Sequence, residues 1–243
     1  IGDVEEALVS DVAEFLRALG ARAGVLPGWP TWTAAVTGSR HAHAMLYGDR
    51  PVGSEGRLHP YWVAKDVAES LQPDDTLVYD GGEASGWMNF FGRAARPRSW
   101  FGLGNMGGLG VGPGFAIGAQ VARGGGRTVL TTGDGAIGFH LSELETMARL
   151  RLPITIVVFN NLGWGMSFHG QDIVYGSGSR VASDLPEIRY DQIAASMGLH
   201  GERVTRLDDL GPALERARAT GGPACVDVAV DPDRTPELSE PTP

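Results

Sequence analysis

Cysteine is nearly absent from this sequence: Cys225 is the only one among 243 residues. A single thiol cannot build a disulfide framework, a cysteine-rich zinc site or a cysteine-ligated iron–sulfur cluster within the chain. Cys225 also stands inside the apolar run Ala-Cys-Val-Asp-Val, residues 224–228. That context predicts a small, buried core side chain.

Long apolar runs and clusters of basic residues are missing as well. No run approaches the roughly 18 apolar residues of a membrane-spanning helix, and no signal peptide is visible, which predicts a cytoplasmic protein that does not enter a membrane. The formal net charge is −9, without a stretch rich in Lys or Arg, so neither nucleic acid nor an anionic membrane is an expected partner. The chain begins with Ile1 rather than Met, and we expect a fragment or a processed product.

What is present is a globular composition, 42% hydrophobic and 20% charged, sufficient for one sizeable α/β domain with appendages. From Leu58 onward, strand patterns alternate with helical patterns. The expected strands are 76–80, 128–132, 154–160, 201–205 and 224–230, with a short apolar piece at 100–101. The expected helices are 58–72, 111–123, 140–151, 187–198 and 207–219. This alternation predicts an α/β fold in which a parallel sheet carries helices on both faces.

The segments outside this domain show weaker patterns. Apolar residues at helical spacing between Val4 and Leu19 predict a helix that ends near Gly20. Residues 25–57 lose periodicity and mix proline, tryptophan and glycine, which predicts a connector. The compact domain is expected to cover residues 58–231. The proline- and acid-rich end, 232–243, is predicted to be a flexible tail, with order lost from about Asp231.

Polar residues follow two of the expected strands. Gly133-Asp134-Gly135 follows one strand, and Asn160-Asn161 closes the next. Since ligands bind beyond the carboxyl ends of parallel strands, both groups can meet at one ligand. A carboxylate and an amide oxygen suit magnesium or calcium, and a helix expected soon after Gly135 could present free N–H groups to a phosphate. Each group alone also fits an ordinary turn, but together they favour a magnesium–diphosphate site.

The spacing of these groups resembles the fingerprint of the thiamine diphosphate-dependent enzyme superfamily. Gly-Asp-Gly is followed by 24 residues and then by Asn-Asn. The runs Glu-Leu-Glu-Thr-Met at 143–147 and Leu-Pro at 152–153 fit the same pyrophosphate-binding domain. The resemblance implies bound thiamine diphosphate, with Mg²⁺ held by Asp134, Asn161 and the backbone carbonyl of Gly163.

Two further segments resemble cofactor loops of that domain. Residues 80–85, Asp-Gly-Gly-Glu-Ala-Ser, resemble the first diphosphate loop, and residues 104–112 resemble the stretch that holds the aminopyrimidine. The resemblance implies that the Gly107 carbonyl accepts from the cofactor's amino group and that Leu109 supports its bent shape; core packing is the alternative for Leu109. The implied cofactor-binding residues are Gly82, Ser85, Gly107, Leu109, Gly133, Asp134, Gly135, Ala136, Asn161, Gly163 and Trp164.

Residues 160–171 and 223–230 resemble benzaldehyde lyase and acetolactate synthase-like enzymes, and residues 1–24 resemble the end of the family's middle domain. The resemblance implies a carboligase or lyase, or a 2-oxo acid decarboxylase, acting on a small 2-oxo acid or aldehyde through an enamine (acyl-anion) intermediate. In such enzymes a glutamate on a separate pyrimidine-binding domain activates the cofactor. No segment of this sequence resembles that domain: Glu143 and Glu145 are expected on a helix surface, and Glu83 near the phosphate loop.

We therefore expect this chain to supply half of a cofactor site and to be inactive without a pyrimidine-binding domain or subunit. It is either one subunit of a split, heteromeric enzyme or the carboxyl half of a longer chain. Because such a site is built across an interface, the resemblance implies a dimer of heterodimers or a tetramer.

Candidate residues for the chemistry itself are few, and none in this chain is assigned as catalytic with certainty. His169 and Met166 follow the expected metal loop and are candidates for the substrate pocket. His169 could form a hydrogen bond or transfer a proton there, or it could pack against Phe168. Three tryptophans could line an apolar pocket or fill the core: Trp87, Trp100 and Trp164.

Three other interpretations stay open. The pair His41 and His43 could bind a metal, but no Cys or acidic partner stands at suitable spacing. A nicotinamide-binding domain would require Gly-x-Gly-x-x-Gly after the first strand, and the glycines around Gly108 and Gly110 lack that spacing. A non-catalytic or regulatory subunit that keeps the cofactor-domain fold is the alternative to an enzyme.

Overall fold

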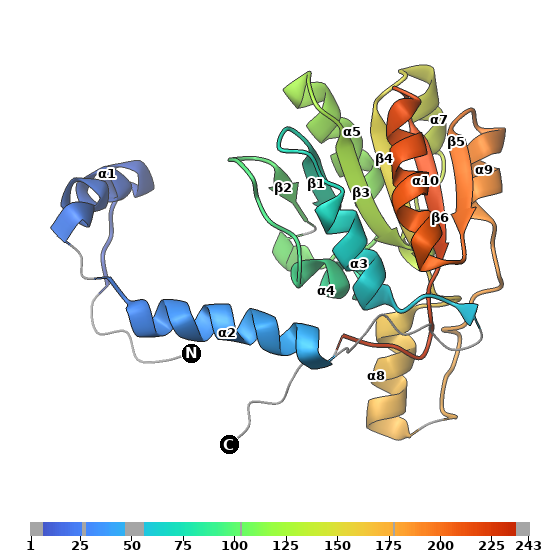
Figure 1. Cartoon of the computed structure of the whole chain (residues 1–243), viewed down its shortest axis with the longest axis horizontal. Helices are drawn as coiled ribbons and strands as arrows, with labels where there is room; N and C mark the ends of the chain where they lie inside the picture. Colours follow the sequence, from blue (N-terminus) through green and yellow to red (C-terminus); the bar gives the residue numbers. More distant parts are fainter. Residues whose placement is uncertain (1–6, 26–27, 47–55, 103, 177, 237–243) are drawn as a thin grey trace. The chain divides into compact units, whose positions relative to one another are not determined.

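The structure is a computed structural model that describes residues 7–25, 28–46, 56–102, 104–176 and 178–236. The chain divides into two compact units, Ile1–Leu46 and Tyr47–Pro243, which Figure 1 traces along the sequence. Within these described ranges, no helix is both long enough and apolar enough to cross a membrane.

The first unit contains the helices α1 (Val12–Arg22) and α2 (Pro30–Leu46), with a short 3₁₀ turn, η1 (Ala23–Val25), after α1. The predicted helix 4–19 was wrong at both ends. It begins later because the Asp11 carboxylate accepts from two backbone N–H groups of the first turn and caps the helix. It also continues through Gly20, since one helical glycine costs only about 1 kcal/mol.

The stretch expected to lack regular structure contains α2, so the absence of periodicity did not predict its conformation. Pro30 occupies the first helical position, where its fixed φ angle and missing N–H are tolerated. His41 and His43 lie on this helix, but their side chains fall outside the described residues.

The second unit is built on a six-stranded parallel sheet, as predicted. The strand order is β2-β1-β3-β4-β6-β5, and every neighbouring pair is parallel. The strands are β1 (Thr76–Tyr79), β2 (Trp100–Phe101), β3 (Thr128–Gly133), β4 (Ile154–Asn160), β5 (His200–Val204) and β6 (Ala224–Ala229).

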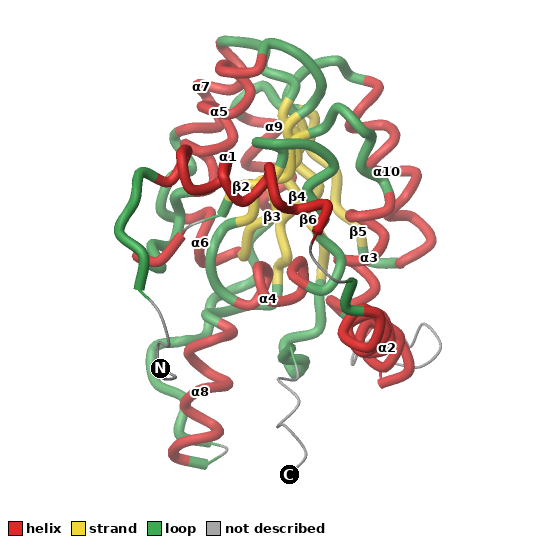
Figure 2. The backbone as a smooth tube through the Cα atoms, turned by 90° about the vertical axis from the view of Figure 1, so that its left-hand side faces the viewer, coloured by secondary structure: helices red, strands yellow, loops and turns green. Residues whose placement is uncertain are grey.

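Helices cover both faces of this sheet, which confirms the expected layers (Figure 2). On one face lie α3 (Pro60–Glu69), α4 (Glu83–Asn89) and α10 (Leu207–Ala219). On the other lie α5 (Gly112–Arg123), α6 (Asp134–Gly138), α7 (Glu143–Arg149) and α9 (Tyr190–Ser196). Alternate side chains of β4 enter opposite cores, for example Val157 and Val158, as expected for a central strand. Cys225 is fully buried in the second core, as predicted.

Two helices were not predicted because they start in glycine-rich sequence. Residues 80–85 turn directly into α4, whose Trp87 and Met88 are buried. The segment after Asn161 forms α8 (Gly165–Tyr175), which buries Phe168 and extends beyond the carboxyl ends of the strands (Figure 1). Burial of these large side chains outweighs the weak helix propensity of glycine.

The chain enters and leaves this unit side by side. Leu58 N–H donates to Ala229 O at 2.9 Å, and Asp231 N–H donates to Leu58 O at 2.8 Å. Asp231 is only 1% exposed, so the prediction that order is lost from this residue was wrong. Its backbone and its carboxylate both have partners, Arg234 Nε lying 3.4 Å from Oδ2. Residues 237–243 of the predicted tail lie outside the described part.

The strand order creates a crevice between β1 and β3. From β1 the chain passes to β2 at one edge of the sheet through α4, whereas from β3 it passes to β4 on the other side through α6 and α7. The connections after β1 and β3 therefore diverge to opposite faces, which makes this a topological switch point, the usual ligand site of such sheets.

Candidate functional site

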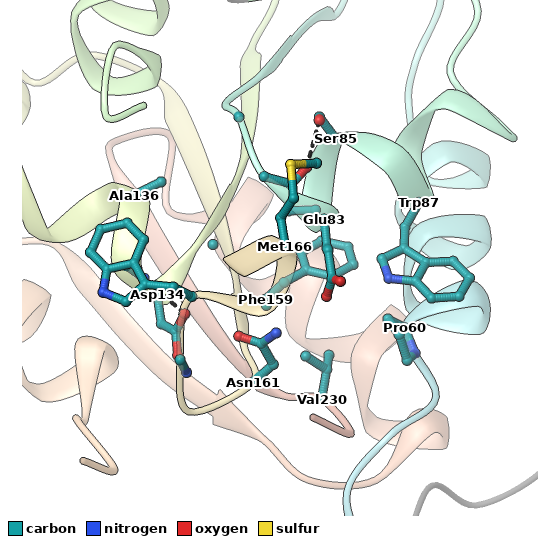
Figure 3. A pocket seen from close by; sticks show the side chains of 18 of the residues that line it. Pro60, Glu83, Ser85, Trp87, Asp134, Ala136, Phe159, Asn161, Met166 and Val230 are labelled. Atoms are coloured by element: carbon teal, nitrogen blue, oxygen red, sulfur yellow. Dashed lines mark hydrogen bonds between the residues drawn. The ribbon is translucent and has the colours of Figure 1, made fainter. Parts of the chain in front are cut away.

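A cavity of about 300 Å³ opens at this switch point. Figure 3 shows its labelled side chains: Asp134 and Asn161 lie on one side, Trp87 and Pro60 on the other, and Glu83 and Met166 lie between them. The walls come from the loops after β1, β3, β4 and β6 and from the loop that precedes α5.

Every residue predicted to bind the cofactor lines this one cavity. The set comprises Gly82, Ser85, Gly107, Leu109, Gly133, Asp134, Gly135, Ala136, Asn161, Gly163 and Trp164. Met166 lines it too, whereas His169 lies outside the lining and contacts it through Glu83. The structure thus brings together residues that are separated by up to 82 positions in the sequence, from Gly82 to Trp164.

Asp134 begins α6 directly after β3 and is 2% exposed. Its Oδ1 accepts from Gly135 N–H at 2.8 Å, and its Oδ2 accepts from Gly163 N–H at 3.0 Å. Burial raises the pKa of this carboxyl to about 7, against the opposing effect of those backbone donors. A cation beside the carboxylate would favour its ionised form.

Three oxygen atoms converge in what we call the metal cradle: a carboxylate oxygen of Asp134, the amide oxygen of Asn161 and the carbonyl oxygen of Gly163. The amide oxygen of Asn161 lies 3.2 Å from Asp134 Oδ1 and 2.9 Å from Gly163 O. Turned by 180°, the amide would instead donate from its NH₂ group to both atoms. Neighbouring oxygens of an octahedral Mg²⁺ site are about 2.9 Å apart, because each lies 2.0–2.1 Å from the metal.

This donor set fits magnesium. Oxygens at such separations repel each other unless a cation lies between them, so a bound metal would select the orientation in which the Asn161 oxygen faces inward. One carboxylate, one amide and one carbonyl leave room for phosphate oxygens and water, as Mg²⁺ requires. Nowhere in the described ranges are three His, Cys, Asp or Glu side chains grouped to hold a metal, so the cradle relies on an amide and a carbonyl oxygen beside its one carboxylate.

A hydrogen bond from α9 fixes the backbone at Asp134, on the side away from the metal cradle. Tyr190 of α9 donates from its hydroxyl to the Asp134 carbonyl at 2.8 Å. Burial, reinforced by the nearby Asp134 carboxylate, raises the pKa of this phenol, so Tyr190 keeps its proton and remains a donor. Asn160, the first asparagine of the pair, lies on β4 and donates to Asp227 Oδ1 at 3.0 Å and to Ile188 O at 2.9 Å. It supports the sheet rather than the cavity.

Asp80 connects two of the cofactor loops. It is fully buried, and its carboxylate accepts from Gly110 N–H at 3.0 Å, from Gly112 N–H at 3.1 Å and from the Thr132 hydroxyl at 3.3 Å. The sequence placed Asp80 in the diphosphate loop. In the structure it faces away from the cavity and fixes the loop that carries Gly107 and Leu109.

That loop presents Gly107 and Leu109 to the cavity. Gly107 has a φ of 62°, a left-handed conformation that glycine adopts without strain. Leu109 is 37% exposed, so the core-packing alternative does not describe it. An apolar side chain held at a cavity mouth is available to support a bound molecule.

Other cavity residues were not predicted from the sequence. Pro60, Phe159, Val230, Asp231 and Arg234 line it, and none of them was a candidate site residue from the sequence. Among the tryptophans, Trp87 and Trp164 line the cavity, whereas Trp100 does not. The ring of Trp100 packs against that of Tyr79, with 5.8 Å between the ring centroids.

Glu83, which the sequence predicted only to lie near the phosphate loop, forms a buried contact with His169. It is 9% exposed, lines the cavity, and its Oε1 lies 2.5 Å from Nδ1 of His169. The two residues are 86 positions apart, and no local pattern in either segment predicts that they meet.

A parallel sheet with a switch-point cavity, a magnesium-type oxygen set and glycine-rich loops defines a domain that binds a diphosphate-bearing cofactor. Residues 80–228 match the family model of the thiamine pyrophosphate enzyme C-terminal TPP-binding domain. The chain belongs to this family, as the fingerprint predicted.

Known relatives agree with that assignment. The chain is 39% identical over 175 residues to a probable acetolactate synthase of Mycobacterium bovis, covering 72% of this chain and 32% of the relative. It is 36% identical over 168 residues to 2-hydroxyacyl-CoA lyase 2 of Caenorhabditis elegans, covering 68% and 26%. It is 35% identical over 160 residues to sulfoacetaldehyde acetyltransferase of Castellaniella defragrans, covering 66% and 27%. The chain matches about a third or less of the length of these relatives.

Proposed function

We propose that this chain is the cofactor-domain half of a thiamine diphosphate- and Mg²⁺-dependent enzyme that makes or breaks carbon–carbon bonds. The reaction class is a carboligase or lyase, or a 2-oxo acid decarboxylase, with a small 2-oxo acid or aldehyde substrate. The names of the relatives, a synthase, a lyase and an acetyltransferase, span the same classes. The metal cradle is the observation that carries the proposal.

The residues present would hold the cofactor in three places. Asp134, Asn161 and Gly163 O would bind Mg²⁺ and, through it, the diphosphate. Backbone N–H groups in the first turn of α4 would contact phosphate oxygens, since the N-cap residue Gly82, with a φ of 81°, provides no side-chain cap for them. Gly107 and Leu109 would hold the part of the cofactor that lies beyond the diphosphate. When bound, thiamine diphosphate supplies the nucleophile and electron sink for chemistry beside a carbonyl group.

The chain is proposed to be inactive alone, because no residue among those described is placed to act as the activating glutamate of a pyrimidine-binding domain. Glu145 is exposed on α7, and Glu83 follows β1 in the diphosphate loop of this domain rather than in a pyrimidine-binding domain. The assembly we propose joins this domain to a pyrimidine-binding domain or subunit, as a dimer of heterodimers or a tetramer.

The test is cofactor binding by the complete enzyme that carries this chain. Titration calorimetry with thiamine diphosphate and Mg²⁺ should show binding by the wild type and a loss of at least about tenfold in Asp134→Asn, because the variant removes the charged metal ligand. Asp208→Asn, on the exposed side of α10, is the matched control. Wild-type enzyme without cofactor affinity would instead favour a non-catalytic subunit that retains the fold.

A further inference from the structure

A buried carboxylate–imidazole pair lies beside the cavity and is not used by the proposed cofactor contacts. Glu83 stands in the first turn of α4, and His169 stands in α8. Nδ1 of His169 lies 2.5 Å from Oε1 of Glu83. The side chain of His169 is 12% exposed and that of Glu83 is 8% exposed, so the pair is shielded from bulk water.

The two members of the pair have different positions relative to the cavity. Glu83 lines it, whereas His169 does not. In Figure 3 the Glu83 carboxylate extends into the space between Asn161, Phe159 and Trp87. His169 therefore contacts the Oε1 side of the carboxylate, whereas Oε2 lies toward Gly165 and Asn161, which line the cavity.

That second oxygen, Oε2, is buried and accepts no hydrogen bond from any described residue. A buried carboxylate oxygen without a partner has lost its hydrogen bonds to water without a replacement, which is unfavourable. A hydrogen-bond donor from a bound molecule would remove this cost. Both Oε2 and the amide nitrogen of Asn161 lie within 2.6 Å of the point where a β-carbon of residue 165 would stand, so this oxygen adjoins the metal cradle.

The surroundings of the Glu83 carboxylate are mostly apolar, which favours a direct hydrogen bond between this carboxylate and a bound molecule. Phe159, Val230 and Met166 supply apolar walls. The other charged residues that line the cavity are Asp134, in the cradle, and Asp231 and Arg234, which face each other. Apolar walls strengthen hydrogen bonds to a charged oxygen.

We propose that Glu83 is a substrate-contacting acid–base residue whose Oε2 exchanges a proton with an oxygen atom of the substrate, and that His169 is its positioning residue. This rests on the proposed function, because it requires a carbonyl or hydroxyl substrate in the cavity. When a 2-hydroxy carbonyl compound is cleaved, the hydroxyl O–H bond breaks and its electron pair forms the new C=O bond, while the proton passes to Oε2. The adjacent carbon–carbon bond breaks in the same step, and its electron pair stays with the other fragment, for which thiamine diphosphate would be the electron sink. In the ligation direction the same proton returns. Nδ1–H of His169 donates to Oε1 throughout.

The experiment uses single variants of the complete enzyme, scored by cofactor affinity and by steady-state kinetics. Glu83→Gln keeps the shape and hydrogen bonding of the side chain but cannot exchange the proton. We expect kcat to fall by about 10²–10⁴-fold, with KM and the cofactor Kd within about threefold of wild type, since ground-state binding is retained.

The partner residue is tested by a conservative and a disruptive change. His169→Asn retains a donor near the position of Nδ1 and should keep kcat within about tenfold of wild type, whereas His169→Phe should approach the loss seen in Glu83→Gln. Glu145→Gln and His200→Asn are matched controls, since both residues lie outside the cavity.

The outcomes separate this inference from the proposed function. Cofactor binding by the wild type tests the proposed function alone. If the wild type binds cofactor but Glu83→Gln turns over within threefold of it, or loses cofactor affinity and kcat together, then Glu83 is a structural or cofactor-anchoring residue and the inference is overturned. A wild type that binds no cofactor overturns both. Equal losses in His169→Asn and His169→Phe would remove the positioning role.

Discussion

At Gly165, a β-carbon would stand 2.3 Å from Glu83 Oε2 and 2.6 Å from the amide nitrogen of Asn161. Real side chains do not tolerate such contacts, so Gly165→Ala must displace one or both neighbours. We expect the affinity for Mg²⁺ and cofactor to fall at least about tenfold, since Asn161 is a proposed ligand and 1.4 kcal/mol of strain suffices for that change.

The matched control is Gly170→Ala in the same helix, where a β-carbon has no neighbour within 4 Å. That variant should be neutral or more stable by about 0.5–1 kcal/mol because glycine is unfavourable inside a helix. Calorimetry would measure the Mg²⁺ and cofactor affinity of both variants, and thermal unfolding would measure their stability. Unchanged metal affinity in Gly165→Ala would show that the crowding is relieved without cost.

At the residue scale, the family resemblance implied Asp134, Asn161 and Gly163 as metal ligands. The three residues come within hydrogen-bond distance of one another, and their role in metal binding stays a prediction. The Glu83–His169 contact was not predicted, because it depends on the path of α8 after the metal loop. That path is set by the burial of Phe168 and has no periodic signature in the sequence.

At the scale of elements, Asp80 joins β1 to the loop before α5. Asp80→Asn replaces one acceptor oxygen with a donor that must face the N–H group of Gly110 or Gly112. The loop should loosen, and the cofactor Kd should rise about 10–100-fold, as is typical when a support behind a ligand-holding group is lost. Hydrogen exchange of the two glycine amides should accelerate in the cofactor-free enzyme.

Thr132→Val provides a graded comparison for that variant. It removes the Thr132 hydroxyl, which lies 3.3 Å from both the Asp80 carboxylate and the Gly133 carbonyl, and leaves the Asp80 carboxylate intact. We therefore expect an effect of about 1 kcal/mol or less. Cofactor affinity in Asp80→Asn equal to that of wild type would contradict the role assigned to Asp80.

The start of α3 carries a pH-dependent contribution to stability. His59 caps this helix by accepting from Tyr61 N–H at 3.2 Å. Burial, with a smaller effect of Arg234, lowers the pKa of His59 to about 4, while Asp231 opposes the change. Between pH 6.5 and 4 the unfolded chain binds a proton that the folded chain does not, so the free energy of unfolding decreases as the pH falls through this window.

His59→Asn keeps a capping side chain but does not titrate. Chemical denaturation at pH 7 and pH 4.5 should show a smaller pH-dependent loss in this variant, by about 1–3 kcal/mol. An identical pH dependence in both proteins would mean that other groups account for it.

Elements were predictable in proportion to their burial and regularity. The central strands β3 and β4 and the helix α10 were found at nearly their observed bounds, because continuous apolar runs or helical spacing specify them. The helices α4 and α8 were missed, since their first turns are glycine-rich loop sequences, and α2 was missed because its apolar residues follow no helical period.

For the whole molecule, three exposed apolar side chains line the cavity or adjoin residues that line it: Met166 lines it, Phe139 contacts Trp164, and Met106 precedes Gly107. Met106, Phe139 and Met166 are 94%, 58% and 63% exposed. Such exposure is characteristic of surfaces that another domain covers. We expect native mass spectrometry to find this chain joined to a pyrimidine-binding domain, and Met106→Glu and Phe139→Glu to weaken that association and, with it, activity.

Leu150→Glu is the control for these changes, since Leu150 is 49% exposed and precedes β4, at the opposite end of the strands. It should leave assembly intact. Equal effects from all three substitutions would indicate a general loss of solubility rather than loss of an interface.

The side-by-side path of the chain at Leu58 and Asp231 makes this unit suited to circular permutation. A short linker could join the two points, and new termini could be opened in the Gly124–Gly126 turn between α5 and β3, away from the residues that line the cavity. The permuted domain would keep its sheet order while its new ends emerged far from the cofactor loops. It could then be fused to reporter or scaffold proteins without obstructing the mouth of the site.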